Sequence, residues 1–361
     1  MPRERVVVGM SGGVDSAVTA AILKEEGYEV EAVTLTFWKD EDRAEEEKSW
    51  KDRSCCKVGL ARFVAQRLSI SHEVVDLNEA FRREVIDDFC DVYLSGATPN
   101  PCIRCNERIK FGLLLDLARE RGAVALATGH YARVRTDAGS GRVRLFQAND
   151  PSKDQSYFLY RLGQSQLSEV RFPLGDLRKE EVYQKAAELG LPYEEVLESQ
   201  EICFVNQRDY RDVLAEMRPE ARRSGPILDR EGNILGSHEG FPFYTVGQRR
   251  GLGISARQRL YVTEVRPVQN AVVVGEEGSL YRKELTVGSL NWIRWEAPPF
   301  PFRVAAKIRH RTSPAPAWLE QIDGKSVRVV FDELHRGITP GQSAVFYENG
   351  EVLGGGIVER D

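Results

Sequence analysis

A glycine-rich segment at residues 9–16 has the residue types that bind phosphate. It reads Gly-Met-Ser-Gly-Gly-Val-Asp-Ser and lies between an apolar run at 6–8, typical of a buried strand, and a helical pattern at 15–26. Adjacent glycines let backbone amides approach an anion, Ser11 and Ser16 supply hydroxyl donors, and a helix start attracts negative charge. No lysine follows the glycines, so this is not a Walker A loop. A tight turn with a helix cap is the structural alternative.

Three cysteines have the setting of nucleophiles or metal ligands. Cys102 and Cys105 lie in a proline-rich loop that opens onto a helix expected at 109–121, and Cys203 lies where a helical region gives way to a β-rich one. A thiol at a helix N-terminus beside arginines is expected to have a depressed pKa and to be a good nucleophile or ligand. Half of a structural zinc site is an alternative, although no histidine motif accompanies the pair.

These residues belong to a chain that alternates strands and helices up to about residue 128 and becomes β-rich after residue 206. Strands are expected at 6–8, 29–37, 73–75 and 124–128, and helices at 15–26, 58–68, 79–94, 109–121 and 179–189. This alternation predicts a parallel sheet with helices on both faces and a ligand site at the carboxyl ends of its strands. Later runs with frequent Gly and Pro predict antiparallel strands in one or two small barrels. The predicted domains are 1–205, 206–279 and 280–361.

Composition limits the class of protein. The chain has 361 residues, of which 42% are hydrophobic and 29% charged, so it is neither disordered nor a membrane protein. Its start lacks the pattern of a signal peptide, which predicts a cytoplasmic location. Six cysteines in that reducing compartment are not expected to form a disulfide framework. Cys90 fits a helix core, Cys55 and Cys56 fit a supporting pair, and the polar stretch 39–53 fits a loop.

The net charge of −5 is unevenly distributed. Before residue 206 the chain has 28 Lys and Arg against 35 Asp and Glu, and from there on it has 22 against 20. A local basic surface for nucleic acid is therefore compatible with the acidic total. Candidate phosphate-binding arginines are Arg249, Arg250, Arg257, Arg259, Arg309 and Arg311.

The string SGGVDS at 11–16 resembles the pyrophosphate loop of ATP pyrophosphatases, which split ATP between the α and β phosphates to adenylate a substrate oxygen. The resemblance implies that the loop holds pyrophosphate, that Asp15 helps to place Mg²⁺, and that adenine lies near Leu35 and Gly129. The implied ATP-binding residues are Gly9, Met10, Ser11, Gly12, Gly13, Val14, Asp15, Ser16, Leu35 and Gly129.

Motifs spread over most of the chain resemble those of the tRNA-specific 2-thiouridylase family. They lie in the expected order at 11–16, 55–56, 100–111, 128–132, 153–157, 199–204 and 247–252. The resemblance implies an α/β pyrophosphate-loop domain with a helical extension, a small central domain and a C-terminal β-barrel. It also implies an ATP-dependent sulfurtransferase that converts the wobble uridine, position 34, to 2-thiouridine in the tRNAs for Lys, Glu and Gln.

Roles follow from this resemblance by position. Cys203 carries a persulfide received from a sulfur-relay protein or cysteine desulfurase, and Cys105 is the nucleophile that closes a disulfide with it or releases sulfide from it. The target base in the anticodon stem-loop lies beside Asn100, Pro101 and Cys102. Other implied tRNA contacts are Lys153, Asp154, Gln155, Arg309 and His310.

One departure from the family affects the mechanism. Many members have Asn-Pro-Asp where this chain has Asn100-Pro101-Cys102, so a carboxylate proposed as general acid or base is missing. Cys102, Cys105 and Cys203 together could instead hold a [4Fe–4S] cluster that delivers hydrosulfide. Another adenylating pyrophosphatase and an RNA-binding module with a degenerate nucleotide fold are the remaining alternatives.

Overall fold

The computed structural model describes residues 3–37, 57–191, 202–205 and 208–360, which form two compact units. The first unit comprises Met1–Val85, Cys102–Asn206 and Asn349–Leu353, and the second comprises Ile86–Pro101, Gln207–Glu348 and Gly354–Asp361. The predicted loop at 39–53, the Cys55–Cys56 pair and motif residues 199–201 lie outside the described residues.

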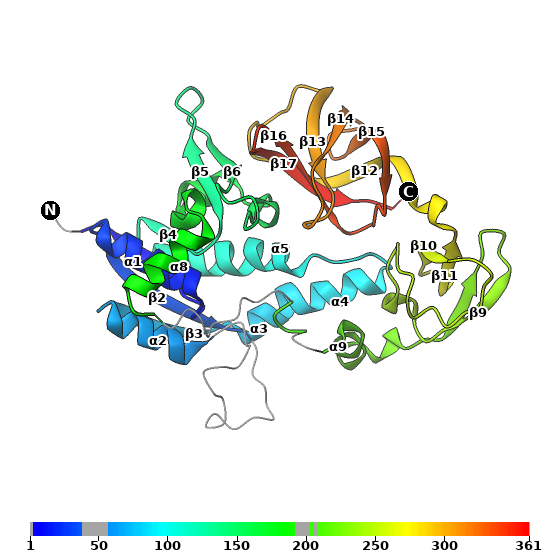
Figure 1. Cartoon of the computed structure of the whole chain (residues 1–361), viewed down its shortest axis with the longest axis horizontal. Helices are drawn as coiled ribbons and strands as arrows, with labels where there is room; N and C mark the ends of the chain where they lie inside the picture. Colours follow the sequence, from blue (N-terminus) through cyan, green and yellow to red (C-terminus); the bar gives the residue numbers. More distant parts are fainter. Residues whose placement is uncertain (1–2, 38–56, 192–201, 206–207, 361) are drawn as a thin grey trace. The chain divides into compact units, whose positions relative to one another are not determined.

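A parallel five-stranded sheet is the centre of the first unit (Figure 1). Its strands are β1 (Arg5–Gly9), β2 (Glu29–Thr36), β3 (Ser71–Asp76), β4 (Ala125–Thr128) and β7 (Val170–Arg171), in the order β3-β2-β1-β4-β7. The chain moves outward from β1 to β2 and β3 and then returns to place β4 on the other side of β1. The loops after β1 and β4 therefore meet at the switch point, where α/β sheets bind ligands.

Helices pack against this sheet, as the alternating pattern predicts. The helices of the first unit are α1 (Val14–Glu25), α2 (Val58–Arg67), α3 (Asn78–Phe81), α5 (Pro101–Cys105), α6 (Leu114–Glu120), α7 (Gln164–Ser168) and α8 (Lys179–Glu188), with π-helical turns at Arg82–Ile86 and Asn106–Leu113 and 3₁₀ turns at Ser156–Leu159 and Pro173–Asp176. Of these, α1, α2 and α6 contact strands of the sheet directly. Figure 1 shows α1 and α8 side by side. Val18 of α1 and Val182 and Ala186 of α8 are fully buried in one apolar cluster with Val6 and Val8 of β1.

The helix expected at 109–121 begins eight residues earlier, at Pro101. Helix α5 continues through a π-helical turn into α6, so both Cys102 and Cys105 are helical. Proline is favoured in the first turn of a helix because its missing N–H would have no partner there and its φ is already helical. The proline that indicates a loop in the sequence instead starts the helix.

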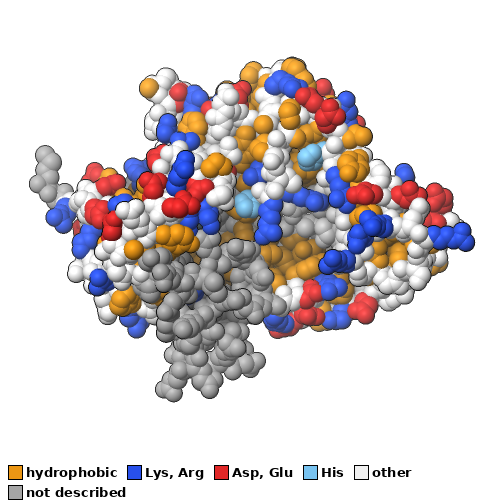
Figure 2. All heavy atoms as spheres, in the orientation of Figure 1, with side chains coloured by type: hydrophobic (Ala, Val, Ile, Leu, Met, Phe, Trp, Pro, Cys, Tyr) orange, Lys and Arg blue, Asp and Glu red, His pale blue; other side chains and the backbone are white. Residues whose placement is uncertain are grey.

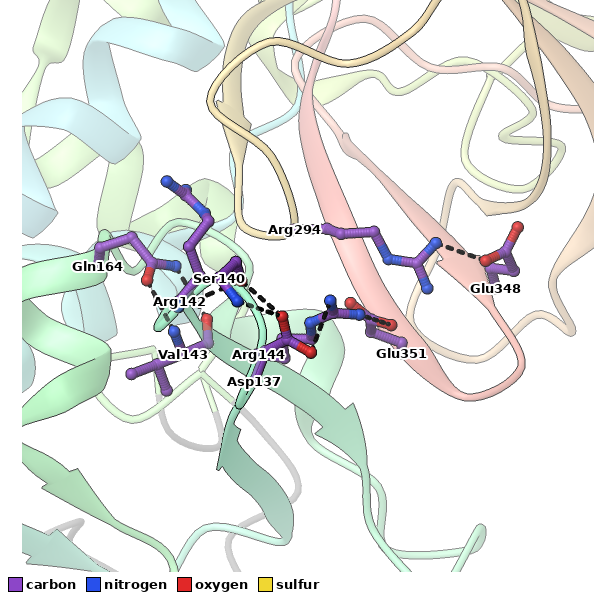
Figure 3. Close-up of polar contacts among 9 residues, drawn as sticks. All are labelled: Asp137, Ser140, Arg142, Val143, Arg144, Gln164, Arg294, Glu348 and Glu351. Atoms are coloured by element: carbon purple, nitrogen blue, oxygen red, sulfur yellow. Dashed lines mark hydrogen bonds and ion pairs between the residues drawn. The ribbon is translucent and has the colours of Figure 1, made fainter.

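A hairpin of β5 (Ala132–Thr136) and β6 (Val143–Gln147) extends the first unit and was not predicted. Glu351 and Val352, from far along the chain, pair with Phe146 and Leu145 of β6. Arg144 makes ion pairs with Asp137 at 2.9 Å and with the buried Glu351 at 3.5 Å (Figure 3). The two strands are short and alternate Arg with apolar residues, and an isolated two-stranded hairpin is only marginally stable. The pairing of β6 with residues 351–352 therefore stabilises it.

The second unit contains α4 (Asp87–Leu94), α9 (Tyr210–Met217) and a small four-stranded sheet. The sheet has β8 (Gly225–Leu228), β9 (Ile234–His238), β10 (Tyr261–Arg266) and β11 (Ala271–Gly275), in the order β10-β11-β8-β9. Strands β11 and β8 pair in parallel, which differs from the purely antiparallel arrangement predicted. Ile227, Val262 and Val272 are completely buried in its core.

A closed six-stranded barrel follows in this unit, as predicted. Its strands are β12 (Tyr281–Trp292), β13 (Phe302–Lys307), β14 (Ala315–Gln321), β15 (Val327–Arg336), β16 (Ser343–Glu348) and β17 (Glu351–Val358). The order is β12-β15-β14-β13-β16-β17, and pairing of β12 with β17 closes the barrel. Closure removes unpaired strand edges, which otherwise promote aggregation. An ion pair between Arg294 and Glu348 joins the segment after β12 to the end of β16 (Figure 3).

Candidate active site

The glycine-rich segment connects the end of β1 to the start of α1. Gly13 is the N-cap of α1 and no side chain caps the helix there, so the first-turn amides can receive an anion. The Ser16 hydroxyl donates to the carbonyl oxygen of Gly13 at 3.0 Å and accepts from the amide of Ser11 at 3.2 Å. The loop is therefore shaped by its own hydroxyls around the positive end of a buried helix, which is the arrangement that binds phosphate.

Two glycines are required by close backbone contacts at this loop. Gly12 has a φ of +79°, and a Cβ atom there would lie 2.5 Å from the carbonyl oxygen of Lys57. Gly129 directly follows β4, and a Cβ atom there would lie 2.8 Å from the amide nitrogen of Ser16 and 2.9 Å from Cβ of Asp15. The loops after β1 and β4 therefore touch, and any side chain at Gly129 would push against the phosphate loop.

Asp15 is held by two residues that the sequence analysis did not assign to the ATP site. Its Oδ1 atom accepts a hydrogen bond from the Tyr131 hydroxyl at 2.8 Å and forms an ion pair with Nζ of Lys179 at 2.7 Å. Tyr131 lies three residues beyond β4, so the topology places it near the loop. No spacing pattern relates position 15 to position 179, so Lys179 could be found only from the folded chain.

Leu35 is buried near the end of β2, at the same edge of the sheet as the phosphate loop. Its neighbour Thr34 donates its hydroxyl to the carbonyl oxygen of Met10 at 2.7 Å and pairs with Nε2 of His72 at 2.8 Å. Burial lowers the pKa of His72, which favours the neutral imidazole in this contact. These bonds fix the end of β2 against the loop, where the sequence analysis expects adenine.

Both thiols of the Cys102–Cys105 pair have raised pKa values, contrary to the expected depression. Cys105 is buried, and burial raises its pKa to about 12, with only partial opposition from the Lys110 ammonium. Cys102 is exposed, yet the protein atoms around it still displace enough water to raise its pKa. Desolvation therefore outweighs the helix N-terminus and the nearby positive charges.

The two arginines expected to activate these thiols have other partners. Arg104 donates to the carbonyl oxygen of Glu84 at 3.2 Å and pairs with Glu107 at 3.4 Å, while Arg108 lies 3.9 Å from a carboxylate oxygen of Glu107. Arg161 also pairs with Glu107, at 3.1 Å. Glu107 thus neutralises the arginine charge that was expected, from the sequence, to lower the pKa of the two cysteines.

The donor set for a [4Fe–4S] cluster is not assembled in this structure. Cys102, Cys105 and Cys203 share a neighbourhood, since charge on Cys203 raises the pKa of the other two thiols and charge on Cys102 raises that of Cys105. Nevertheless, within the described part of the chain no three His, Cys, Asp or Glu side chains come together as metal ligands. A cluster needs three converging thiolates, which this arrangement of the described residues does not supply. The residues present do not fit the cluster.

The raised pKa of Cys105 predicts a specific pH dependence for its reactivity. With a pKa of about 12, roughly one thiol in 10⁵ is ionised at pH 7, so alkylation by iodoacetamide should be slow and should accelerate about tenfold per pH unit between pH 7 and 9. Mass spectrometry of the Cys105 peptide would measure the rate, with glutathione in the same tube as the ordinary thiol. A rate that levels off below pH 8 would restore the depressed pKa expected from the sequence.

Residues 153–155 form a turn whose members have different environments. Asp154 is buried, and its carboxylate accepts hydrogen bonds from the amide of Ala148 at 3.1 Å and from the hydroxyl of Ser156 at 2.9 Å. Gln155 is joined to Tyr131 by two hydrogen bonds, of 2.8 and 3.0 Å, one through its backbone amide and one through its side-chain oxygen. Lys153 is partly exposed. The turn is therefore hydrogen-bonded to Tyr131, in the loop after β4, and the hydroxyl of Tyr131 in turn contacts Asp15.

In the second unit, two of the arginines noted in the sequence line one cavity. Arg249 and Arg259 line a cavity of about 350 Å³ together with Gly251–Gly253. Figure 2 shows Lys and Arg side chains gathered near β10 and β11 on the face in view. His310 is exposed, whereas Arg309 donates to the carbonyl oxygen of Gly337 at 2.6 Å and to the Thr339 hydroxyl at 2.9 Å.

Known proteins match this chain over nearly its whole length. Three family models match in succession: the tRNA methyl transferase HUP domain at residues 4–207, the tRNA methyl transferase PRC-barrel domain at 211–276 and the aminomethyltransferase beta-barrel domain at 282–358. The tRNA-specific 2-thiouridylase MnmA of Moorella thermoacetica is 47% identical over 98% of this chain and 99% of its own. That of Heliobacterium modesticaldum is 46% identical over 99% of this chain and 93% of its own.

The chain belongs to the tRNA-specific 2-thiouridylase family. The family resemblance stated from the motifs is thereby confirmed. The HUP-domain match of this 2-thiouridylase family member covers residues 4–207. It includes the phosphate loop, Gly129, Lys179 and the cysteines at 102, 105 and 203. The pyrophosphate-loop fold implies ATP binding.

One solved structure that is similar to this chain is a distant match. A 4-thiouridine synthetase solved with RNA and ATP is 20% identical, over 60% of this chain and 51% of its own, with a TM-score of 0.35. Among the described helices, none has the length and apolar character needed to cross a bilayer.

Proposed function

We propose that this protein is an ATP-dependent tRNA-uridine 2-sulfurtransferase. The observation that carries the proposal is the presence, in one unit, of an intact phosphate loop at 9–16 and of Cys105 and Cys203. Family membership over the full chain supports the same activity. Other adenylating pyrophosphatases, which share only the phosphate loop with this chain, would not need the thiols.

The first chemical step makes the uracil C2 oxygen a leaving group. That oxygen attacks the α phosphorus of ATP, the bond to the bridging oxygen breaks, and pyrophosphate leaves with the electron pair. The phosphate loop with Ser11 and Ser16 holds the phosphates at the helix N-terminus. Asp15 would hold Mg²⁺, which would supply charge neutralisation on the phosphates.

The second step transfers sulfur. The outer sulfur of a persulfide on Cys203 attacks C2 of the adenylated base, and AMP leaves. Cys105 then attacks the Cys203 sulfur, which forms a Cys105–Cys203 disulfide and leaves sulfur on C2; a cellular dithiol reduces the disulfide. In the alternative order, Cys105 first attacks the Cys203 persulfide and releases sulfide, and the sulfide then attacks C2. We propose the persulfide route because the three thiols are not arranged to hold a cluster.

We further propose that the substrate is uridine 34 in the anticodon stem-loop of tRNAs for Lys, Glu and Gln. The amide nitrogen Nδ2 of Asn100 is buried and has no hydrogen-bond partner among the described residues, so a base oxygen would satisfy it. Cys102 and Pro101 would adjoin the flipped base. Lys153, together with Asp154 and Gln155 that fix its turn, and Arg309 with His310 would contact the tRNA backbone.

The activity can be tested with ATP, a cysteine desulfurase with cysteine as sulfur donor, and a tRNA-Glu transcript. We expect AMP, pyrophosphate and 2-thiouridine in equal amounts, measured by labelled ATP and by nucleoside mass spectrometry. The matched control is the same tRNA with cytidine at position 34, which should give none of the three. ATP cleavage without thiolated base would indicate another adenylating enzyme, and tRNA binding without ATP cleavage would indicate a binding module.

A further inference from the structure

Lys179 places a buried ammonium group beside the phosphate loop. Its side chain is only 5% exposed, whereas the side chain of Asp15, its ion-pair partner at 2.7 Å, is 30% exposed. The ammonium also lies 4.8 Å from the ring centre of Tyr183 and 5.5 Å from that of Tyr131. Lysine is almost never fully buried without a partner, and here the carboxylate and the two rings are the partners that stabilise the buried charge.

The backbone of Lys179 is fixed as firmly as its side chain. Lys179 is the first residue of α8, and its amide donates to Oδ2 of Asp150 at 3.1 Å. Val182 and Ala186 bury the same helix against the sheet and α1. The ammonium is therefore at the end of a flexible four-carbon chain whose starting point on α8 is fixed.

We propose that Lys179 is a phosphate-binding residue that stabilises the pyrophosphate leaving group during adenylation. This inference rests on the proposed function. Asp15 belongs to the loop that receives the phosphates, so an ammonium 2.7 Å from its carboxylate lies beside the nucleotide phosphates as well. Mg²⁺ held by Asp15 would compete for the carboxylate that pairs with Lys179, and the ammonium would then be available to the β and γ phosphate oxygens. Its charge offsets the negative charge that collects there as the bond to the α phosphorus breaks.

The alternative is that Lys179 only neutralises Asp15 and braces α8 against α1. The two roles differ in what Mg²⁺ should do. If neutralisation were the whole role, saturating Mg²⁺ would replace the missing ammonium in a Lys179→Met variant. A direct contact to phosphate cannot be replaced in this way, and its loss should affect pyrophosphate and ATP but not AMP, which lacks the β and γ phosphates.

The test compares Lys179→Met with Lys185→Met on the same helix, where Lys185 is 37% exposed and pairs with Glu25 at 3.5 Å. Isothermal titration with ATP, AMP and inorganic pyrophosphate, each at low and at saturating Mg²⁺, gives the affinities. We expect Lys179→Met to lose at least tenfold for pyrophosphate and ATP, to keep AMP affinity, and to lose about 10²-fold in kcat for AMP release. Lys185→Met should match the wild type.

Three results would overturn the inference: full pyrophosphate affinity in a folded Lys179→Met variant, recovery of that affinity at high Mg²⁺, or an equal loss for AMP. If Lys179→Met does not fold, wild-type protein with ¹⁵N-lysine serves instead, with the Lys179 Nζ signal assigned by Lys179→Arg. That signal should shift when pyrophosphate binds, and an unmoved signal refutes the contact. A wild type that binds neither ATP nor pyrophosphate would refute the proposed function itself.

Discussion

Replacing Cys203 with alanine should abolish 2-thiouridine formation while leaving adenylation of the tRNA intact. Cys203 is partly buried, next to Phe204, whose ring packs edge-on against Phe81 at 5.9 Å between ring centres. Alanine removes the sulfur without disturbing this packing. Because the persulfide has no other carrier in the proposed route, the rate of sulfur transfer should fall by more than about 10³-fold. Pyrophosphate release in a single turnover should stay near the wild-type rate.

The other cysteines provide matched controls for this experiment. Cys105→Ala should lose sulfur transfer to a similar extent, because it removes the thiol that resolves the persulfide. Cys90→Ala changes a completely buried thiol on α4, as the sequence predicts, and should lower stability by about 1 kcal/mol without changing the reaction.

Cys102→Ala separates the two sulfur-delivery routes. In the persulfide route Cys102 carries no sulfur, so thiolation should stay within about tenfold of the wild type. In the cluster route its loss would be as severe as that of Cys203. A Cys102→Ala variant as inactive as Cys203→Ala, or a Cys203→Ala variant that still thiolates tRNA, would contradict the persulfide route with Cys203 as the sulfur carrier.

The sequence was a good guide to features that depend on local pattern. Strand–glycine loop–helix order predicts the loop at 9–16 and the parallel sheet, and both are confirmed because neighbouring elements determine them. The helix that begins at Pro101 was predicted to begin eight residues later, at 109. The prediction was wrong because proline is common both in loops and in the first turn of helices. The domain boundaries and the roles of the site residues stay predictions.

Other features depend on contacts between distant parts of the chain. Lys179 meets Asp15 across 164 positions, and Glu351 meets Arg144 across 207. The pKa of Cys105 was predicted in the wrong direction for a related reason. The sequence displays its neighbouring arginines, but neither the burial of the thiol nor the competing carboxylate of Glu107 is visible before the chain folds.

Gly129→Ala should impair the ATP site through backbone contact alone. The added methyl group would lie 2.8 Å from the amide nitrogen of Ser16 and 2.9 Å from Cβ of Asp15, so α1 or the loop after β4 must shift. Such overpacking should cost about 1–3 kcal/mol in the free energy of unfolding. ATP affinity, measured by titration calorimetry, should fall at least about tenfold, because the same shift moves the amides that bind phosphate.

The same substitution at Gly59 is the matched control for this effect. Gly59 lies in α2, and a Cβ atom there would meet nothing within 4 Å. Alanine is the better helix former, so Gly59→Ala should raise stability by about 0.5–1 kcal/mol and leave ATP affinity unchanged. If Gly129→Ala instead bound ATP like the wild type, the loop after β4 would not press on α1 in solution. Gly129 would then have no part in shaping the phosphate site, and the glycine would need another explanation.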